Sequence, residues 1–399
     1  MIGFSGSRGG ESYRGTSGVG LGTVLVVAAL LLGAALWSEG EEPSKSGTGG
    51  NTQATLNPLL VHQRPGTWMR LPSKSPMRPG RIHDHAGGAI DPETSVLYFF
   101  GSDNHGSEWN NDVWSYNPLT MVWSQSYPED PPATYRYLDG IKTTTTGHPW
   151  AMHSFAMNAW DPVRRQLVVG VWQMHYDLTS LPDVKIPARA GESWWQYDPS
   201  GNRWTPALRS PNLDLGHICY VASLKRIIGF DTDNMPVAIY DPEKKSFETF
   251  RSFFGGRSPE GYTLRSVYDT KRDRILLLSW DDGPNLWAFD LKKKRWTNLQ
   301  VKNRPKGSVY GSWDYDQAAD AIVSLWPEDP KGQFDNPSGK SRTFVIDLTQ
   351  NAYREIKTQP AAPYTGMSYR VLYDARHEVT FAVEGNTVWS FKAPVPEAR

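Results

Sequence analysis

The chain has 399 residues, of which 12% are aromatic, and it is rich in Gly (36) and Pro (30). This composition suits many short strands separated by turns better than long helices. Lys and Arg together number 42, as do Asp and Glu. The even balance argues against nucleic acid as a partner, because nucleic-acid binding rests mainly on phosphate neutralisation. The single cysteine, Cys219, excludes an intrachain disulfide.

The N-terminal region contains a long apolar run. Residues 19–37 are almost wholly apolar and carry no charge. At 1.5 Å per residue, ~20 helical residues cross a bilayer core, so residues 18–38 are predicted to form a transmembrane signal anchor. Arg residues precede the run and Glu residues follow it, which places residues 1–17 in the cytoplasm and the rest outside. Small residues at 33–35 leave a cleaved signal peptide, and so a secreted protein, as the alternative.

The segment after the apolar run has the composition of a linker. Residues 39–66 are rich in Gly, Ser, Thr, Asn, Pro and Glu, which predicts a flexible tether with no part in the folded core. No Asn-x-Ser/Thr sequon with x other than Pro occurs in the chain. Its absence favours a bacterial periplasm or cell surface over a eukaryotic secretory pathway.

Beyond residue 66, one sequence module recurs. Its second half is an aromatic-rich strand, a turn of Asp, Pro, Gly and Lys, and a short strand that holds a large aromatic residue, a pattern that predicts a tight hairpin. The two key residues of this half are always seven apart: Tyr116 and Trp123, Tyr197 and Trp204, Tyr240 and Phe247, Phe289 and Trp296, Ile346 and Tyr353. These aromatic residues are predicted to pack in the core.

The first half of the module repeats as well. An Asp lies six residues before a residue of the following strand in Asp91…Leu97, Asp161…Leu167, Asp269…Ile275, Asp316…Ile322 and Asp374…Thr380. The third module lacks this Asp and is expected to have a shortened turn at residues 222–224. Each module therefore supplies four strands, and four-stranded sheets that repeat every 40–50 residues indicate the blades of a β-propeller. Longer intervals between modules are interpreted as loop insertions.

The ends of the chain complete the count of blades. The sixth module ends at residues 388–391 (VWSF) and has no fourth strand of its own, whereas residues 67–71 form a fourth strand with no third strand before it. Pairing residues 67–71 with residues 387–391 closes the ring and removes exposed sheet edges. The prediction is an all-β, six-bladed propeller over residues 67–394.

The modules resemble the kelch family. Residues 110–123 (NNDVWSYNPLTMVW) match the later half of a kelch repeat, and the resemblance covers about residues 67–394. Kelch repeats have a Gly-Gly pair at the end of the second strand, whereas this chain has Phe100-Gly101, Val169-Gly170 and Ile228-Gly229. The resemblance implies a kelch-like fold and says little about activity, since propellers host unrelated functions.

One face of the predicted ring gathers polar side chains. The starts of the innermost strands and the loops between second and third strands open onto the same face. Positions eight and four residues before the turn Asp share parity, so their side chains share one side of a strand. The candidate ligand-binding residues of this face are His83, His85, His105, Trp109, His148, Trp150, His153, Trp172, His175, His217, Asp231, Asp233, Arg265, Asp281, Asp282, Trp313 and Arg370.

Three interpretations of this polar face remain open. The carboxylates and guanidinium groups suit a glycan, whose sugars can stack on Trp109, Trp150, Trp172 and Trp313. Imidazoles and carboxylates also suit a transition metal, with His83, His153 and His217 as candidate ligands, although no spacing is a recognised motif and no cofactor is predicted. The third interpretation is structural: inner-strand His and Arg side chains satisfy buried backbone groups.

The sequence favours binding over catalysis. It has no Ser/His/Asp spacing and no nucleophile elbow, and Cys219 adjoins Tyr220 in a strand, where neighbouring side chains point to opposite faces. A thioether between these two residues, as in copper radical oxidases of the galactose oxidase type, is therefore not expected. The predicted function is a membrane-anchored, extracytoplasmic propeller that binds a glycan or a cell-envelope partner protein. The alternative is a metal-dependent enzyme, possibly a copper enzyme, that acts on a carbohydrate.

Overall fold

The structure is a computed structural model, and it describes residues 56–75, 85–102, 108–138, 140–170, 193–209, 215–231, 236–254, 265–279, 285–306, 312–328, 340–363 and 370–395. Helix within these ranges is confined to α1 (Pro58–Val61) and the 3₁₀ turn η2 (Pro132–Thr134). No helix within them is long and apolar enough to cross a membrane. The predicted span, residues 18–38, lies outside the described residues.

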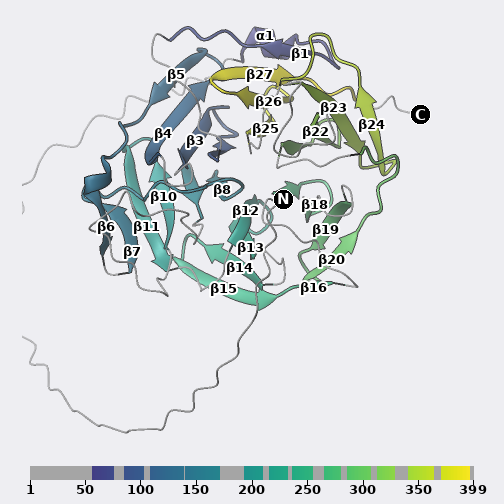
Figure 1. The fold of residues 1–399 in the computed structure, drawn as a ribbon. Coiled ribbons are helices and arrows are strands. Elements are labelled where there is room, and N and C mark those ends of the chain that lie inside the picture. The colour runs from purple at the N-terminus through teal and green to yellow at the C-terminus, as the bar shows by residue number, and fades with distance from the viewer. Residues whose placement is uncertain are drawn as a thin grey trace, which may run out of the picture. The chain divides into compact units, whose positions relative to one another are not determined.

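Six antiparallel sheets surround a central axis, so the protein is a six-bladed β-propeller (Figure 1). Blade one consists of β2 (Gly87–Ile90), β3 (Leu97–Ser102), β4 (Asn110–Asn117) and β5 (Val122–Gln125), from the centre outward. Blade two consists of β8 (Asn158–Asp161), β9 (Gln166–Val169), β10 (Ser193–Asp198) and β11 (Arg203–Arg209). Blade three consists of β12 (Leu215–Val221), β13 (Arg226–Asp231), β14 (Pro236–Asp241) and β15 (Ser246–Arg251).

The remaining blades follow the same order. Blade four consists of β17 (Ser266–Asp269), β18 (Arg274–Ser279), β19 (Asn285–Asp290) and β20 (Arg295–Asn298), with β16 (Phe253–Phe254) added in parallel at its outer edge. Blade five consists of β21 (Trp313–Asp316), β22 (Ala321–Pro327), β23 (Ser341–Asp347) and β24 (Ala352–Ile356). Blade six consists of β25 (Val371–Asp374), β26 (Val379–Glu384), β27 (Thr387–Phe391) and β1 (Trp68–Arg70). The long interval before blade two contains an inserted hairpin, β6 (Tyr135–Leu138) and β7 (Ile141–Thr144).

The seven-residue spacing of the repeat is a cross-strand pair. In each of the five hairpins between third and fourth strands, the two key residues lie directly opposite each other, as Tyr116 does Trp123. The ring centroids of the four aromatic pairs are 4.9–5.1 Å apart. Neighbouring blades also pack through these rings: Phe100 of blade one lies 4.9 Å from Trp204 of blade two, and Phe230 of blade three 5.0 Å from Trp296 of blade four. The predicted core role of the repeated aromatics is confirmed.

The hairpins at one face of the ring, here the turn face, share one design. Each hairpin joins a first to a second strand or a third to a fourth strand. At the first position of most of these turns, an Asp or Asn side chain accepts hydrogen bonds from the backbone N–H groups two and three residues later, as Asp241 does from Glu243 and Lys244. Four residues after that position, the backbone is left-handed in all eleven hairpins, at Ser95, Met121, Arg165, Asn202, Lys225, Lys245, Asp273, Lys294, Asp320, Asn351 and Glu378. None of the eleven is a glycine, although glycine accepts this conformation at the lowest cost.

The turn expected to be short in the third module has the ordinary length. Val221 lies opposite Arg226 in the ladder, just as Asp269 lies opposite Arg274 in blade four. The missing Asp is replaced by a backbone hydrogen bond from the Leu224 N–H to the Val221 carbonyl, at 3.2 Å. The prediction of a shortened turn is therefore wrong, because the turn geometry does not require the carboxylate.

The N-terminal strand closes the ring as predicted. β1 pairs with β27 in antiparallel fashion, with Trp68 opposite Phe391 and Arg70 opposite Trp389. The rings of Trp68 and Phe391 stack at 5.0 Å, so they repeat the cross-strand pair of the other blades with partners from opposite ends of the chain. The Trp68 indole also donates to the Thr343 hydroxyl of blade five at 2.8 Å.

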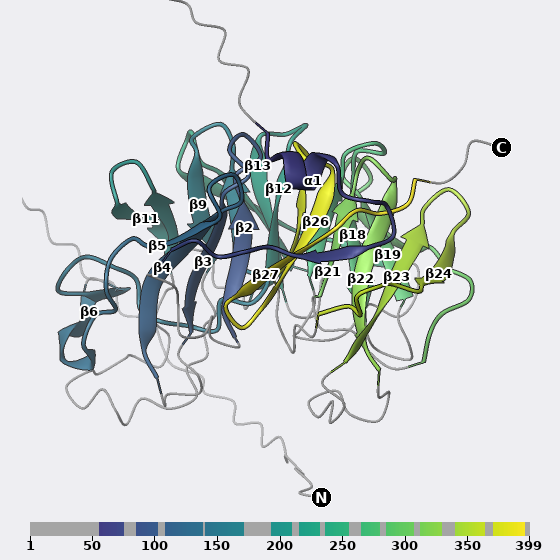
Figure 2. The same ribbon diagram turned by 90° about the horizontal axis from the view of Figure 1, so that it is seen from above.

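The predicted linker ends earlier than expected, because residues 57–66 pack on the turn face beside blades one and six (Figure 2). Leu60 of α1 is fully buried in the cluster that contains Leu97 and Phe381. The Asn57 N–H donates to His377 Nε2 at 3.0 Å, and Gln63 exchanges hydrogen bonds with Ser390. The prediction that residues up to 66 add nothing to the core is wrong for residues 57–66, because the apolar side chain of Leu60 packs between blades one and six.

The contribution of α1 can be measured with two adjacent leucines. We expect Leu60→Ala to lower the free energy of unfolding by about 2–5 kcal/mol, because it leaves a cavity in a packed cluster. Leu59 is 47% exposed, so Leu59→Ala is the matched control and should change the unfolding free energy by less than about 0.5 kcal/mol. Urea unfolding of both variants checks this; equal effects would contradict the placement of α1.

The left-handed turn positions offer a second test, on backbone conformation. Lys245 is exposed with φ of 50°, whereas Lys244 beside it is exposed and has no positive φ. We expect Lys245→Gly to stabilise the fold by up to about 1 kcal/mol, because it removes the steric cost of a side chain in this region. Lys244→Gly should destabilise by about 0.5–1 kcal/mol. Thermal unfolding distinguishes the two; a loss of stability in both would refute the assignment.

Candidate functional site

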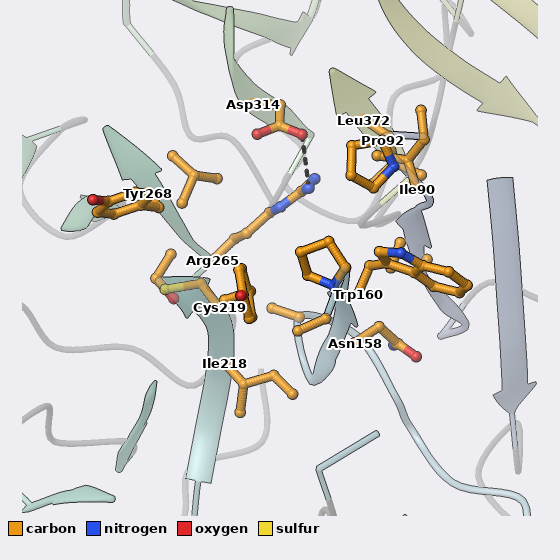
Figure 3. Close-up of a pocket in the computed structure, with 18 of the residues that line it drawn as sticks. Ile90, Pro92, Asn158, Trp160, Ile218, Cys219, Arg265, Tyr268, Asp314 and Leu372 are labelled. Atoms are coloured by element: carbon orange, nitrogen blue, oxygen red, sulfur yellow. Dashed lines mark hydrogen bonds and ion pairs between the residues drawn. The ribbon is translucent and has the colours of Figure 1, made fainter. Parts of the chain in front are cut away.

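The centre of the ring contains a cavity of about 250 Å³ between the innermost strands (Figure 3). Its lining includes Pro92 and Pro162, which belong to turns between first and second strands, so the cavity extends to the turn face. The polar face predicted from the sequence lies at the opposite ends of these strands. Among the predicted site residues that the structure describes, Arg265 is the one that lines this cavity.

One layer of the cavity is built from equivalent positions in all six blades. These positions lie two residues before the turn Asp, or before Val221 in blade three, and they hold Ala89, Ala159, Cys219, Val267, Asp314 and Leu372. Small and apolar side chains leave the axis open in five blades. Asp314 is the charged member of the layer, and it was not among the residues predicted from the sequence.

Arg265 and Asp314 form an ion pair at the edge of the cavity, as Figure 3 shows. Arg265 Nη2 lies 3.1 Å from Asp314 Oδ2, and its Nη1 donates to the Val371 carbonyl. Backbone N–H groups of Tyr373 and Tyr315 donate to the two Asp314 oxygens at 2.9 and 2.8 Å. The side chains are 10% and 15% exposed. The pair thus joins blades four, five and six and still faces the cavity.

Burial governs the ionisation of this carboxyl group. Loss of solvent raises the pKa of Asp314 above its ordinary value of 3.8, and the positive charge of Arg265 and the two backbone donors lower it in part. The Cys219 thiol in the same layer is buried, and burial raises its pKa to about 12. At neutral pH this thiol is protonated, so it is not a nucleophile in this state.

A strained residue closes one side of the cavity. Phe155, which lines the cavity and is 7% exposed, has a φ of 30°. Gly87 of blade one lies so close that a Cβ atom there would come within 1.8 Å of the Phe155 carbonyl oxygen. The Gly87 N–H donates to the Ser154 hydroxyl at 2.8 Å. Strain of this kind is common where a fold positions a site.

Three of the predicted inner-strand His residues, His85, His153 and His217, are buried. His85 and His153 stack on each other with ring centroids 4.1 Å apart, and they are 5% and 1% exposed. His217 stacks on Phe230 at 5.1 Å. His217 and Arg370 are also buried, at the same strand position as Arg265 in their own blades. The structure therefore brings His85 and His153 together, within packed protein.

The described tryptophans predicted to stack on sugars are core residues. Trp313 is fully buried, and Trp109 and Trp150 are 6% and 1% exposed. Trp109 and Trp150 pack with Tyr135 of the inserted hairpin, and the Trp150 indole donates to two backbone carbonyls. Their ring faces are covered by protein, so the stacking role predicted for these three residues is wrong. Trp109 and Trp150 are covered by packing against the inserted hairpin, and Trp313 packs in the core cluster of blades four and five.

His148 has a partner that sequence reasoning missed. His148 Nδ1 lies 2.7 Å from Asp130, which also accepts hydrogen bonds from Asn111, Thr144 and Thr146. The hydrogen bonds from Asn111, Thr146 and His148 outweigh the effect of burial and lower the pKa of Asp130. This cluster fastens the inserted hairpin to blade one. Asp231 lies at the end of β13 and is half-buried.

Other predicted site residues fall outside the described ranges: His83, His105, Trp172, His175, Asp233, Asp281 and Asp282. Within the described ranges, no three or more His, Cys, Asp or Glu side chains come together as a metal ligand group. Two of the three candidate metal ligands, His153 and His217, are described, and each packs against an aromatic ring.

The positions of Arg265 and Asp314 relative to the turn Asp residues are the sequence pattern that could have identified the cavity. Asp314 lies two residues before the turn Asp316, and Arg265 lies four residues before Asp269. These offsets share parity, so the two side chains lie on the same side of their strands. Asp314 was overlooked because a single Asp next to a turn resembles the many turn carboxylates. The distance between two blades is not encoded in either strand alone.

Comparisons with known proteins assign the chain no family and no function. No protein-family model and no curated protein matches the chain. Solved structures with a similar fold include a structural genomics protein of unknown function from Bacteroides thetaiotaomicron, with 9% identity and a TM-score of 0.47 over 81% of this chain and 74% of that one. They also include a chain of a nidogen/laminin complex, with 11% identity and a TM-score of 0.38 over 60% of this chain and 76% of that one.

The raised pKa of Asp314 predicts a dependence of stability on pH. Because the folded protein holds this proton at pH values where the unfolded chain has lost it, the free energy of unfolding should fall as pH rises from 3.8 to the folded pKa. Asp314→Asn should remove this part of the decline. Urea unfolding over a pH series measures it, and an identical pH dependence in the variant would contradict the prediction.

Proposed function

We propose that this protein is an extracytoplasmic, membrane-anchored binding propeller that takes one sugar residue of a glycan in its central cavity. The observation that carries the proposal is the Arg265–Asp314 pair at the cavity edge. A guanidinium group offers fixed donors and a carboxylate offers acceptors, and sugar hydroxyls need both. The same two groups also hold three blades together, which is the role that a test has to separate from binding.

The size and lining of the cavity support a single sugar ring. A volume of about 250 Å³ is below the roughly 300–1,000 Å³ of sites for larger ligands. Its walls are mainly apolar, with few convergent polar groups, as in most small-molecule sites. Tyr220 and Tyr268 also line the cavity and add aromatic surface to it. The tryptophans that the sequence suggested for this purpose are replaced in the proposal by these two residues.

The proposal includes the location of the propeller outside the cytoplasm and its relationship to kelch-like propellers. The apolar run at residues 18–38, with basic residues before it and acidic residues after it, supports a membrane anchor with the propeller outside the cytoplasm. The match of residues 110–123 to the later half of a kelch repeat supports a kelch-like origin. A propeller anchored in this way would meet the glycans of the cell envelope, which are therefore the proposed class of ligand.

Binding can be tested on the full-length protein with a panel of hexoses, N-acetylhexosamines and uronic acids. We expect saturation-transfer NMR to detect at least one of them and Asp314→Asn to weaken it by roughly 10- to 100-fold, since hydrogen bonds to charged groups contribute about 1.5–3 kcal/mol. The matched control is Asp320→Asn, because Asp320 pairs with Arg272 outside the cavity. No binding by any sugar, or equal binding by both variants, would refute the proposal. Melting temperatures show whether a loss reflects unfolding.

A further inference from the structure

The turn face has two halves of opposite charge. The hairpins of blades three and four carry eleven basic and five acidic residues, a net charge of +6, at residues 221–226, 241–246, 269–274 and 290–295. The hairpins of blades five, six and one carry one basic and seven acidic residues, a net charge of −6 with His neutral, at residues 316–321, 347–352, 374–379, 91–96 and 117–122. The chain is neutral overall, so this separation is a property of the fold.

The basic half presents its charges to solvent. Its exposed members are Lys225, Lys244, Lys245, Lys271, Arg272, Lys292, Lys293, Lys294 and Arg295. The side chains of Lys244 and Lys293 are 76% and 78% exposed, and their ion pairs with Asp241 and Asp290 span 3.9 and 3.3 Å. Exposed pairs of this kind contribute little stability, so these cations remain available to an anionic surface.

Apolar side chains project from the same face. Val163 and Leu224, at hairpin tips of blades two and three, are 56% and 43% exposed. Val163 adjoins Arg164 and Leu224 adjoins Lys225, and apolar groups exposed beside Lys and Arg are typical of surfaces that lie in the membrane interface. Four more exposed apolar side chains, Leu56, Leu59, Val61 and Leu119, lie on the turn face beside blades one and six, in its acidic half.

The place where the described chain begins favours a membrane as the partner of the turn face. The first described residue, Leu56, precedes α1 on the turn face. Residue 38, the end of the predicted anchor, is 18 residues upstream. An unstructured chain of that length would have an end-to-end distance of roughly 25 Å. The proposed anchor would then keep the turn face nearer to the lipid headgroups than the opposite face.

We propose that the turn face docks on an anionic lipid bilayer through the hairpins of blades three and four. Basic residues within about a Debye length of an anionic surface are attracted to it, while Val163 and Leu224 enter the headgroup region. The inference uses the proposed anchor and is independent of sugar binding. Docked this way, the cavity end at Pro92 and Pro162 faces the headgroups, so a ligand that enters there comes from the membrane side.

Docking can be tested with the full-length protein in nanodiscs that hold one copy each. A Cys219→Ala background removes the native thiol, and an environment-sensitive dye is attached through Leu224→Cys or, as the matched control on blade five, Thr349→Cys. Thr349 is an exposed hairpin tip in the acidic half. The discs contain either phosphatidylcholine alone or one part phosphatidylglycerol to two parts phosphatidylcholine.

In the phosphatidylglycerol discs, we expect quenching of the dye at residue 224 by a water-soluble quencher to fall by about threefold. The effect should vanish in phosphatidylcholine, at high salt and in Lys244→Glu/Lys292→Glu/Lys293→Glu, and it should be absent at residue 349. Asp314→Asn should dock normally, which separates this proposal from sugar binding.

Three results would overturn the docking proposal. The first is equal quenching in both lipids. The second is protection of residue 224 in detergent, which would identify a second copy of the chain as the occupant. The third is a failure of the chain to enter nanodiscs, which would remove the anchor. An unchanged melting temperature of the charge-reversal variant shows that its effect is on docking.

Discussion

The cross-strand aromatic pair is the interaction on which the rest of this propeller depends. A four-stranded blade has two apolar faces, and large rings on the outer strands fill the wedge that opens between blades away from the axis. Each Trp or Tyr of this kind buries roughly 150–250 Å². The pair holds the third and fourth strands in register and also contacts the next blade, as Trp204 and Trp296 do. Sheet register and blade packing thus have one cause.

Closure follows from the same pair. Phe391 would have an empty place opposite it if the sixth blade were built from the C-terminal module alone. Trp68 fills that place from the N-terminal end, and residues 57–66 continue over the turn face with Leu60 buried and Asn57 bonded to His377. The entry of the chain at this face is therefore fixed by a packing contact.

The centre of the ring obeys a different constraint. Inner strands converge there, so most positions that face the axis hold small or apolar side chains, and Gly87 is in contact distance of a neighbouring backbone. A charge in that position is costly unless it is paired. Asp314 is paired by Arg265 and by two backbone donors from blades five and six. The equivalent position holds Ala, Cys, Val or Leu in the other five blades, so blade five alone carries this cost there.

The sequence by itself determined what repeats along the chain: the six modules, the seven-residue spacing, the inserted segment before blade two and the pairing of residues 67–71 with 387–391. These are local patterns, because a hairpin places residues seven apart opposite each other wherever it occurs. Only the tertiary structure decided what lies between blades. It buried Trp109, Trp150 and Trp313, stacked His85 on His153 and joined Arg265 to Asp314. Burial and pairing across blades depend on the rotation from one sheet to the next, and no single strand contains that information.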